Sequence, residues 1–432
     1  MKQTILMALL LIAGTIGPLA LGPFIGVAVY YLFAVLRPQY LWAWALPEFN
    51  WSFYVGAATM VAAFLYLPRT FRGKNFSWVH WAMLGFTFCI TLSHLFAVIP
   101  DISSFWYWEY FKIFLMFFCS TFVIKTLDHV KHLYLIAVFA LGYIAYEMNF
   151  LYLVFGRMDI YNEGFGGLDN NGAGLMIAMG IPLAYFLWQA YRQWWRWLFL
   201  ALVPIMLHAV LMSFSRGAMI SLVAVCPLLL IRSKRRGWMI LFFVGIAFIL
   251  PILAGQEIRD RFFSVQQYQE DASAQSRLTS WSTAWKIAKD NPVTGVGLRN
   301  TEIVAIRRYR AQHYTAVHSQ YLQIAADSGF LAISFYLLIL YGSWKSLRVG
   351  EKRWRKSTAE NEQLAYNLAS GIESALLVFC VGASFLSLDV FELPYLLILL
   401  ALKLPLTVPQ EAATSAAAVP SLINPATAYA KA

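Results

Sequence analysis

A polar segment past the middle of the chain decides how the rest is interpreted. Residues 255–315 read GQEIRDRFFSVQQYQEDASAQSRLTSWSTAWKIAKDNPVTGVGLRNTEIVAIRRYRAQHYT and separate two strongly hydrophobic runs. Every other connection between hydrophobic runs is short. Long loops inside compact proteins are usually functional. The segment therefore indicates a membrane-embedded protein whose chemistry takes place in one loop at one membrane face.

The composition supports this interpretation. Of the 432 residues, 60% are hydrophobic and only 13% are charged, whereas a soluble domain has about one-quarter charged residues. The net charge of +11 lies mostly in short loops, where it sets orientation in a membrane and does not indicate nucleic-acid binding. The cysteines lie singly in hydrophobic runs without metal-ligand spacing, so we interpret them as buried apolar side chains: Cys89, Cys119, Cys226 and Cys380.

The hydrophobic runs predict an all-α polytopic membrane protein. A spanning helix needs about 20 apolar residues, and about twelve runs approach that length. They cover residues 4–36, 52–67, 79–98, 105–124, 133–154, 172–190, 195–212, 214–231, 237–254, 316–344, 365–387 and 390–405. The first contains Gly-Pro pairs, so we expect one interrupted span, with two short helices as the alternative. We expect one membrane domain over 1–408, which includes the loop at 255–315, and a disordered tail over 409–432.

Charge predicts the orientation. One set of loops is basic and contains Arg69, Arg72, Lys74, Lys125, Lys131, Arg192, Arg196, Arg232, Lys234, Arg235, Arg236, Lys345, Arg348, Lys352, Arg353, Arg355 and Lys356. The alternating set is acidic apart from Arg37 and Arg157 and contains Glu48, Asp101, Asp159, Glu163, Asp169, Asp389 and Glu392. Basic loops face the cytoplasm. Both termini are then expected inside and the long loop outside, between the ninth and tenth spans.

Part of the long loop has helical periodicity. Leu278, Trp281, Trp285 and Ala288 recur at the spacing of one helix face, and Pro292 then ends the pattern. This predicts an amphipathic helix, either at the outer membrane surface with its tryptophans at headgroup level or packed on the helical bundle.

Three side chains on the outer face could carry chemistry. Arg216, flanked by Ser215 and Gly217, begins a span and is either an anion site or a headgroup anchor. Arg277 is either a phosphate-binding fork or a surface charge. His318, at the start of the next span, is either structural or a proton acceptor, because its pKa range suits that role near neutral pH.

Common metal and nucleotide motifs are absent from the sequence. It contains no Asp-x-Asp pair, no Gly-x-x-x-x-Gly-Lys loop and no His-Glu-x-x-His. Any sugar or phosphate chemistry would therefore depend on arginines for charge neutralisation.

These elements together resemble the O-antigen ligase and polymerase superfamily, and most of all WaaL-type O-antigen ligases and the related O-glycosylation ligases. The motifs are Ser215-Arg216-Gly217, Arg277 followed by Trp281 and Trp285, Asn291-Pro292, Gly295-Val296-Gly297, and His318-Ser319 followed after nine residues by Gly329. The chain departs from the usual pattern at Ala332 and Ile333, where the family has Gly and Thr.

The resemblance implies a GT-C-like glycosyltransferase of the bacterial inner membrane, inverting, metal-independent and without cofactor, with its active site facing the periplasm. The donor would be a glycan on undecaprenyl diphosphate and the acceptor a sugar hydroxyl of lipid A-core in lipopolysaccharide assembly. Arg216 and Arg277 would stabilise the leaving diphosphate, and His318 would deprotonate the acceptor. Substrate contacts are expected from Arg157, Asn170, Asn171, Arg299, His313, Tyr321 and Asp389. The other partners would be membrane lipids and no nucleic acid, and the protein would be a monomer.

Three alternatives remain from the sequence. An O-antigen polymerase and a protein O-oligosaccharyltransferase would use the same donor with a different acceptor. A lipid-linked glycan transporter would instead need ionisable groups near mid-membrane, for which Glu147 and Glu373 are the candidates.

Overall fold

The computed structural model describes residues 2–47, 49–70, 76–155, 164–237, 240, 272–310, 316–388 and 390–408. Throughout these ranges the regular structure is helical apart from an isolated bridge between Phe165 and Leu168. The helices are α1 (Lys2–Thr15), α2 (Gly17–Leu21), α3 (Pro23–Leu36), α4 (Pro38–Leu41), α5 (Trp51–Thr70), α6 (Trp78–Leu95), α7 (Pro100–Val123), α8 (Leu127–Phe155), α10 (Asn170–Ala190), α11 (Arg196–Met212), α12 (Arg216–Arg232), α15 (Ala272–Asp290), α16 (Thr301–Tyr309), α17 (Gln320–Lys356), α18 (Glu360–Gly382) and α19 (Glu392–Thr407).

The predicted class, an all-α membrane protein, is confirmed. Five helices among the described residues are long and apolar enough to cross a membrane: Pro23–Leu41, Leu127–Val154, Asn170–Ala190, Gln320–Lys356 and Glu360–Gly382. The count of twelve spans stays a prediction. The expected span at 237–254 and the tail at 409–432 lie outside the described residues.

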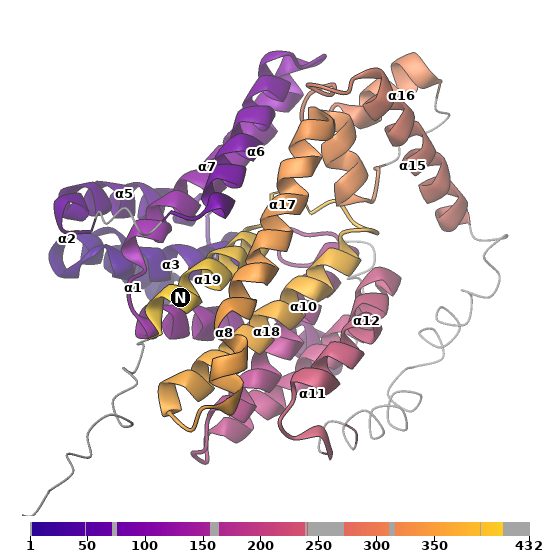
Figure 1. Ribbon diagram of the computed structural model, residues 1–432. Helices are drawn as coiled ribbons and strands as arrows, with labels where there is room; N and C mark the ends of the chain where they lie inside the picture. Colours follow the sequence, from indigo (N-terminus) through magenta and orange to yellow (C-terminus); the bar gives the residue numbers. More distant parts are fainter. Residues whose placement is uncertain are drawn as a thin grey trace, which may run out of the picture.

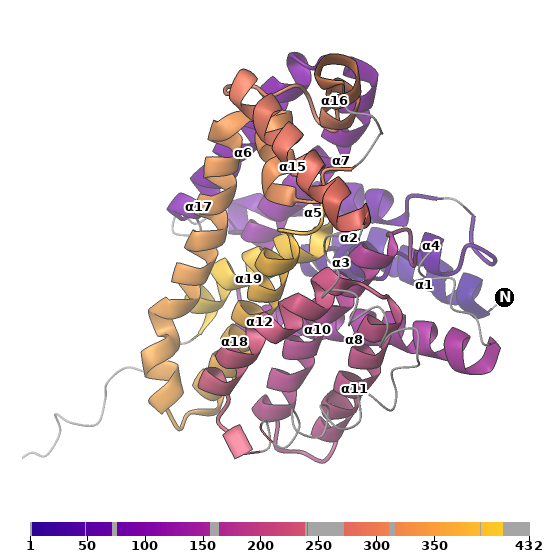
Figure 2. The same cartoon turned by 90° about the vertical axis from the view of Figure 1, so that its right-hand side faces the viewer.

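Helix α10 is the centre of the bundle and is buried along nearly its whole length. It packs against α8, α11, α12 and α18 (Figures 1 and 2). Its glycines allow this, because a Cβ at Gly174 would lie 2.3 Å from the Ser213 hydroxyl and one at Gly180 would lie 3.0 Å from Leu141. Small residues let membrane helices approach closely. α10 thereby fixes the position of the loop between α11 and α12.

Helix α17 connects the bundle with the long loop. It has 37 residues, and Gly329 interrupts it with φ 84° and ψ 173°. α15 and α16 lie beside its first half, at one end of the molecule (Figures 1 and 2). They share a small core with it, to which Ile287, Val296 and Val304 contribute. The described part of the long loop is therefore a helical cap on that end of the bundle.

The prediction of a single interrupted span at 4–36 is wrong. A Cβ at Gly14 would lie 2.7 Å from Val29 and one at Gly17 would lie 3.0 Å from Ile25. The chain therefore turns at its Gly-Pro pairs, and α3 returns alongside α1, which is the two-helix alternative. The Thr4 hydroxyl donates to the Ala45 carbonyl at 3.2 Å. The N-terminus thus lies beside the segment that follows α3. The charge pattern had predicted that these two parts lie at opposite faces.

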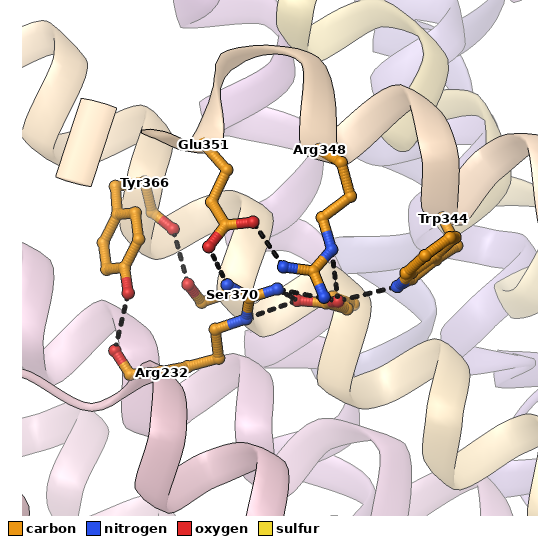
Figure 3. A network of polar contacts seen from close by, with 7 residues as sticks. Arg232, Trp344, Arg348, Glu351, Tyr366 and Ser370 are labelled. Atoms are coloured by element: carbon orange, nitrogen blue, oxygen red, sulfur yellow. Dashed lines mark hydrogen bonds and ion pairs between the residues drawn. The ribbon is translucent and has the colours of Figure 1, made fainter. Parts of the chain in front are cut away.

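The other end of the bundle contains a buried charge network (Figure 3). Arg232, assigned to a basic loop from the sequence, is the last residue of α12, is only 3% exposed and binds Glu373 through Nε at 2.7 Å and Nη2 at 2.9 Å. Glu351 pairs with both Arg232 and Arg348, and the Trp344 indole donates to Glu373 at 2.9 Å. Arg232 therefore joins α12 to α17 and α18, and Glu373 is a paired structural carboxylate.

Candidate functional site

The first wall of the site is formed where α10 and α12 begin. Asp169 caps α10 by accepting from the Gly172 amide at 2.8 Å, and Asn170 donates to the Ser213 carbonyl at 3.0 Å. Ser215 caps α12 by accepting from the Ala218 amide at 3.3 Å. Arg216 is therefore the first residue of α12, beside the start of α10. A helix N-terminus and a guanidinium both favour a bound anion.

Helix α15 brings Arg277 to the same end of the bundle. The ring of Trp281, one turn after Arg277, lies 6.4 Å from that of Phe385. A Cβ at Gly217 would in turn lie 3.2 Å from the Phe385 Cβ. Phe385 thus separates the turn that carries Arg277 from the start of α12. Packing of this helix on the bundle is confirmed, while its place at a membrane surface stays a prediction.

His318 lies in the irregular segment just before α17 and has a left-handed backbone conformation, with φ 50°. The Gln320 amide donates to the carbonyls of Ala383 and Leu386, both at 2.8 Å, and holds this segment against the turn after α18. Desolvation lowers the pKa of His318, and the nearby positive charges of Arg277 and Arg299 lower it further, against the opposing effect of Asp169. The imidazole is therefore neutral near pH 7 and able to accept a proton.

Arg299 closes the site on the side away from α12. Its guanidinium donates to the Ser387 carbonyl at 3.2 Å and lies 4.8 Å from the centre of the Trp106 ring. Its backbone amide donates to Asp327 at 2.8 Å. Arg299 thus lies between α7 and the turn after α18, close enough to His318 to act on its charge.

Asp327 organises this side of the site, and the sequence analysis did not single it out. Its buried carboxylate also accepts from the Thr301 hydroxyl at 2.6 Å, the Thr301 amide at 3.2 Å and the Gln323 amide group at 2.8 Å. It therefore fixes the start of α16 on α17. An acidic residue inside the expected hydrophobic span 316–344 could have indicated such a role, because an isolated buried carboxylate is costly.

The Gly295-Val296-Gly297 motif explains the break in α17. Val296 and Gly297 donate to the carbonyls of Ala326 and Asp327 at 3.1 and 3.0 Å, and Phe330 donates to Pro292 at 2.8 Å. The loop thus takes over backbone hydrogen bonds that a continuous helix would make internally.

Some predicted contacts lie at the site and others do not. Asn171 donates to Asn170 at 3.0 Å, at the start of α10. Tyr321 donates its hydroxyl to the Cys380 carbonyl at 2.8 Å, so it holds α17 on α18. Arg157, His313 and Asp389 lie outside the described residues. Over the described ranges, no group of three His, Cys, Asp or Glu could hold a metal ion.

An all-helical bundle with His318, Arg277 and Arg299 gathered at one end is typical of a multi-pass membrane enzyme. Residues 201–337 match the family model described as O-antigen ligase, so this part of the chain is similar to that family. Members of this family are membrane glycosyltransferase-like ligases or polymerases. The matched segment includes Arg216, Arg277 and His318 and ends in α17. Comparison with curated proteins found no match.

Proposed function

We propose that this protein is an O-antigen ligase, which transfers a glycan from undecaprenyl diphosphate to a sugar hydroxyl of lipid A-core in lipopolysaccharide assembly. The observation that supports it best is the convergence of Arg277, Arg299 and Asp169 on His318. Arg277 in α15 and His318 in the segment before α17 both lie within the residues that match the O-antigen ligase family model.

The chemistry is an inverting displacement at the anomeric carbon. The acceptor hydroxyl oxygen forms the new glycosidic bond while the bond from the anomeric carbon to the diphosphate oxygen breaks. His318 takes the hydroxyl proton, and the electron pair leaves with the diphosphate. Arg216 and Arg277 bind the diphosphate oxygens and neutralise the developing charge, the role that a metal ion has in other enzymes. Asn170 and Asn171 contact the substrate from the start of α10.

The proposed setting is the inner membrane, with the capped end of the bundle facing the periplasm and the C-terminus in the cytoplasm. The basic connections after α5, α7, α10 and α12, and the basic residues in the last turns of α17, support this orientation.

The test is transfer by the purified protein in nanodiscs. Glycan on undecaprenyl diphosphate and lipid A-core are supplied with EDTA, and the lipid product is followed by its mobility shift. We expect a shift that survives chelation and is lost in His318→Ala. His318→Asn is the second variant, because Asn tolerates the positive φ at this position.

The other outcomes separate the alternatives. Elongation of the lipid-linked glycan in place of core transfer would make the protein a polymerase. No reaction with either acceptor would refute the ligase proposal and direct attention to a protein acceptor. Wild-type turnover in both His318 variants would remove His318 as the base.

A further inference from the structure

A second feature of the molecule is a cavity of about 660 Å³ between α3, α5 and α7. The segments that precede α10 and α19 complete it, through Gly167 and Val390. Its volume is within the range of about 300–1,000 Å³ that is usual for small-molecule sites. The lining residues all lie outside 201–337, so the O-antigen ligase match does not account for this cavity.

The cavity shares a wall with the candidate site. Trp106 lines the cavity, and the Arg299 guanidinium lies 4.8 Å from its ring centre. Arg299 in turn acts on the charge of His318. On another side, Arg37 lines the cavity and donates to the Gly167 carbonyl at 3.3 Å, two residues before Asp169. A molecule in this cavity would therefore contact Trp106, the ring on which Arg299 stacks at the edge of the candidate site.

The charges of the lining exclude an anion as the preferred ligand. Two basic groups, Arg37 and Lys112, are matched by two acidic groups, Glu109 and Glu392. Lys112 and Glu109 form an ion pair with each other. The diphosphate is instead assigned to the guanidinium groups of Arg216 and Arg277 at the proposed site, which bind phosphate oxygens well.

The polar lining also disfavours a hydrocarbon chain, because it would leave the charged groups of Arg37, Glu109 and Lys112 and the amides of Gln39 and Asn50 without water. Sugar rings satisfy both halves of the wall. Their hydroxyls exchange hydrogen bonds with amide and charged side chains, and their C–H faces pack on aromatic rings such as Trp108.

We propose that this cavity binds uncharged sugar rings of one of the two glycolipid substrates and holds them against Trp106, at the edge of the candidate site. The proposal rests on the proposed function. The rings belong either to the glycan of the donor or to the core of the acceptor, and the same chemistry would recognise both.

The test fills the cavity with a large side chain introduced on α5. Ala57 lines it, whereas the neighbouring Ala58 does not, so Ala57→Trp and Ala58→Trp form a matched pair. We expect Ala57→Trp to raise KM for one sugar substrate about tenfold, the loss of about 1.4 kcal/mol of binding. Binding of undecaprenyl diphosphate without glycan should be unchanged, as should all constants of Ala58→Trp. Gln39→Leu, which conserves volume, should give a smaller rise for the same substrate.

The affected substrate identifies the source of the rings: a raised donor KM indicates the donor glycan, and a raised acceptor KM indicates the core. Unchanged KM values in both Ala57→Trp and Gln39→Leu would overturn the proposal and leave the ligase function intact. Weaker binding of the unglycosylated carrier would overturn it too, by making the cavity a lipid site. If the wild type transfers nothing, binding of the delipidated oligosaccharides tests the cavity separately. If the wild type binds such an oligosaccharide and Ala57→Trp weakens the binding, the proposed sugar site is supported. If the wild type binds none, the proposed sugar site is refuted.

Discussion

At the scale of single residues, the charges around His318 oppose one another. Burial, Arg277 and Arg299 lower its pKa, and Asp169 raises it. If His318 is the base, kcat/KM should decrease as the pH falls through a pKa below the ordinary 6.5. Asp169→Asn removes the one group that raises this pKa, so the acid limb should move to lower pH. Asn is also a good N-cap, so α10 should keep its start.

The measurement is kcat/KM against pH, with Asp101→Asn as the control. Asp101 is exposed in the first turn of α7 and does not act on His318. An acid limb that stays in place in Asp169→Asn would mean that His318 is not the titrating group.

Arg277 has two proposed roles that a pair of substitutions can separate. Arg277→Gln removes a charge that lowers the pKa of His318, so the acid limb should move to higher pH while donor KM rises. Arg277→Lys keeps the charge and loses the planar fork, so it should retain a near wild-type acid limb. Loss of a charged hydrogen bond of about 1.5–3 kcal/mol predicts a donor KM raised by about 10- to 100-fold in either variant. Wild-type donor KM in Arg277→Gln would remove Arg277 from the diphosphate site.

At the scale of the elements, the break in α17 depends on Gly329. Its φ of 84° disfavours any side chain, and a Cβ would lie 2.4 Å from the Val293 carbonyl oxygen. We expect Gly329→Ala to lower both the stability of the protein and the transfer rate. The break positions Asp327, whose carboxylate accepts from the Arg299 backbone amide. The strain alone should cost about 1–2 kcal/mol, and the contact with Val293 adds to it.

Gly166→Ala is the matched control, because Gly166 has φ 61° and no neighbour within 4 Å of the added Cβ. It isolates backbone strain from the collision with the loop. Thermal unfolding and transfer rate are measured for both variants. Equal loss in the two would mean that the contact between the loop and α17 does not matter.

The same element shows what the sequence could predict. Hydrophobic length correctly placed a helix at 316–344, and the family motif pointed to Gly329. The break itself was not predicted, because Pro292, Val296 and Gly297 specify it from more than 30 residues away through backbone hydrogen bonds. Hydrophobic periodicity indicates which face of a helix is apolar. It does not indicate which backbone groups form hydrogen bonds with a distant loop. For the same reason Asp327 was missed, because its partners Thr301 and the Arg299 backbone lie in that distant loop.

At the scale of the whole molecule, two errors have one physical origin. The sequence analysis assigned 4–36 to a single span and Arg232 to a basic loop. In the structure, glycines let α1 pack on α3, and Arg232 is neutralised by carboxylates from α17 and α18. Hydropathy and charge are counted along the chain. The turn between α1 and α3 and the burial of Arg232 depend instead on contacts between residues that are separated in sequence. The helical class was predictable because many residues contribute to it.

The Arg232 network should stabilise the bundle without taking part in transfer. Glu373 accepts from Arg232 and Trp344 and lies 3.4 Å from the Arg348 Nε. Glu373→Gln removes the charge and leaves Arg232 buried with Glu351 alone. Breaking a buried pair typically costs about 3–5 kcal/mol, and the remaining partner places the expected loss near 3 kcal/mol. Thermal unfolding in detergent measures it.

Glu360→Gln, exposed at the start of the same helix, should change stability by less than about 0.5 kcal/mol. Arg232 and Arg216 are at opposite ends of α12, about 24 Å apart along its axis. The folded fraction of Glu373→Gln should therefore keep the kcat/KM of the wild type. A transporter would behave differently, because a mid-membrane carboxylate would carry its coupling. An unchanged melting temperature together with lost turnover in Glu373→Gln would thus assign Glu373 a functional role and favour the transporter alternative.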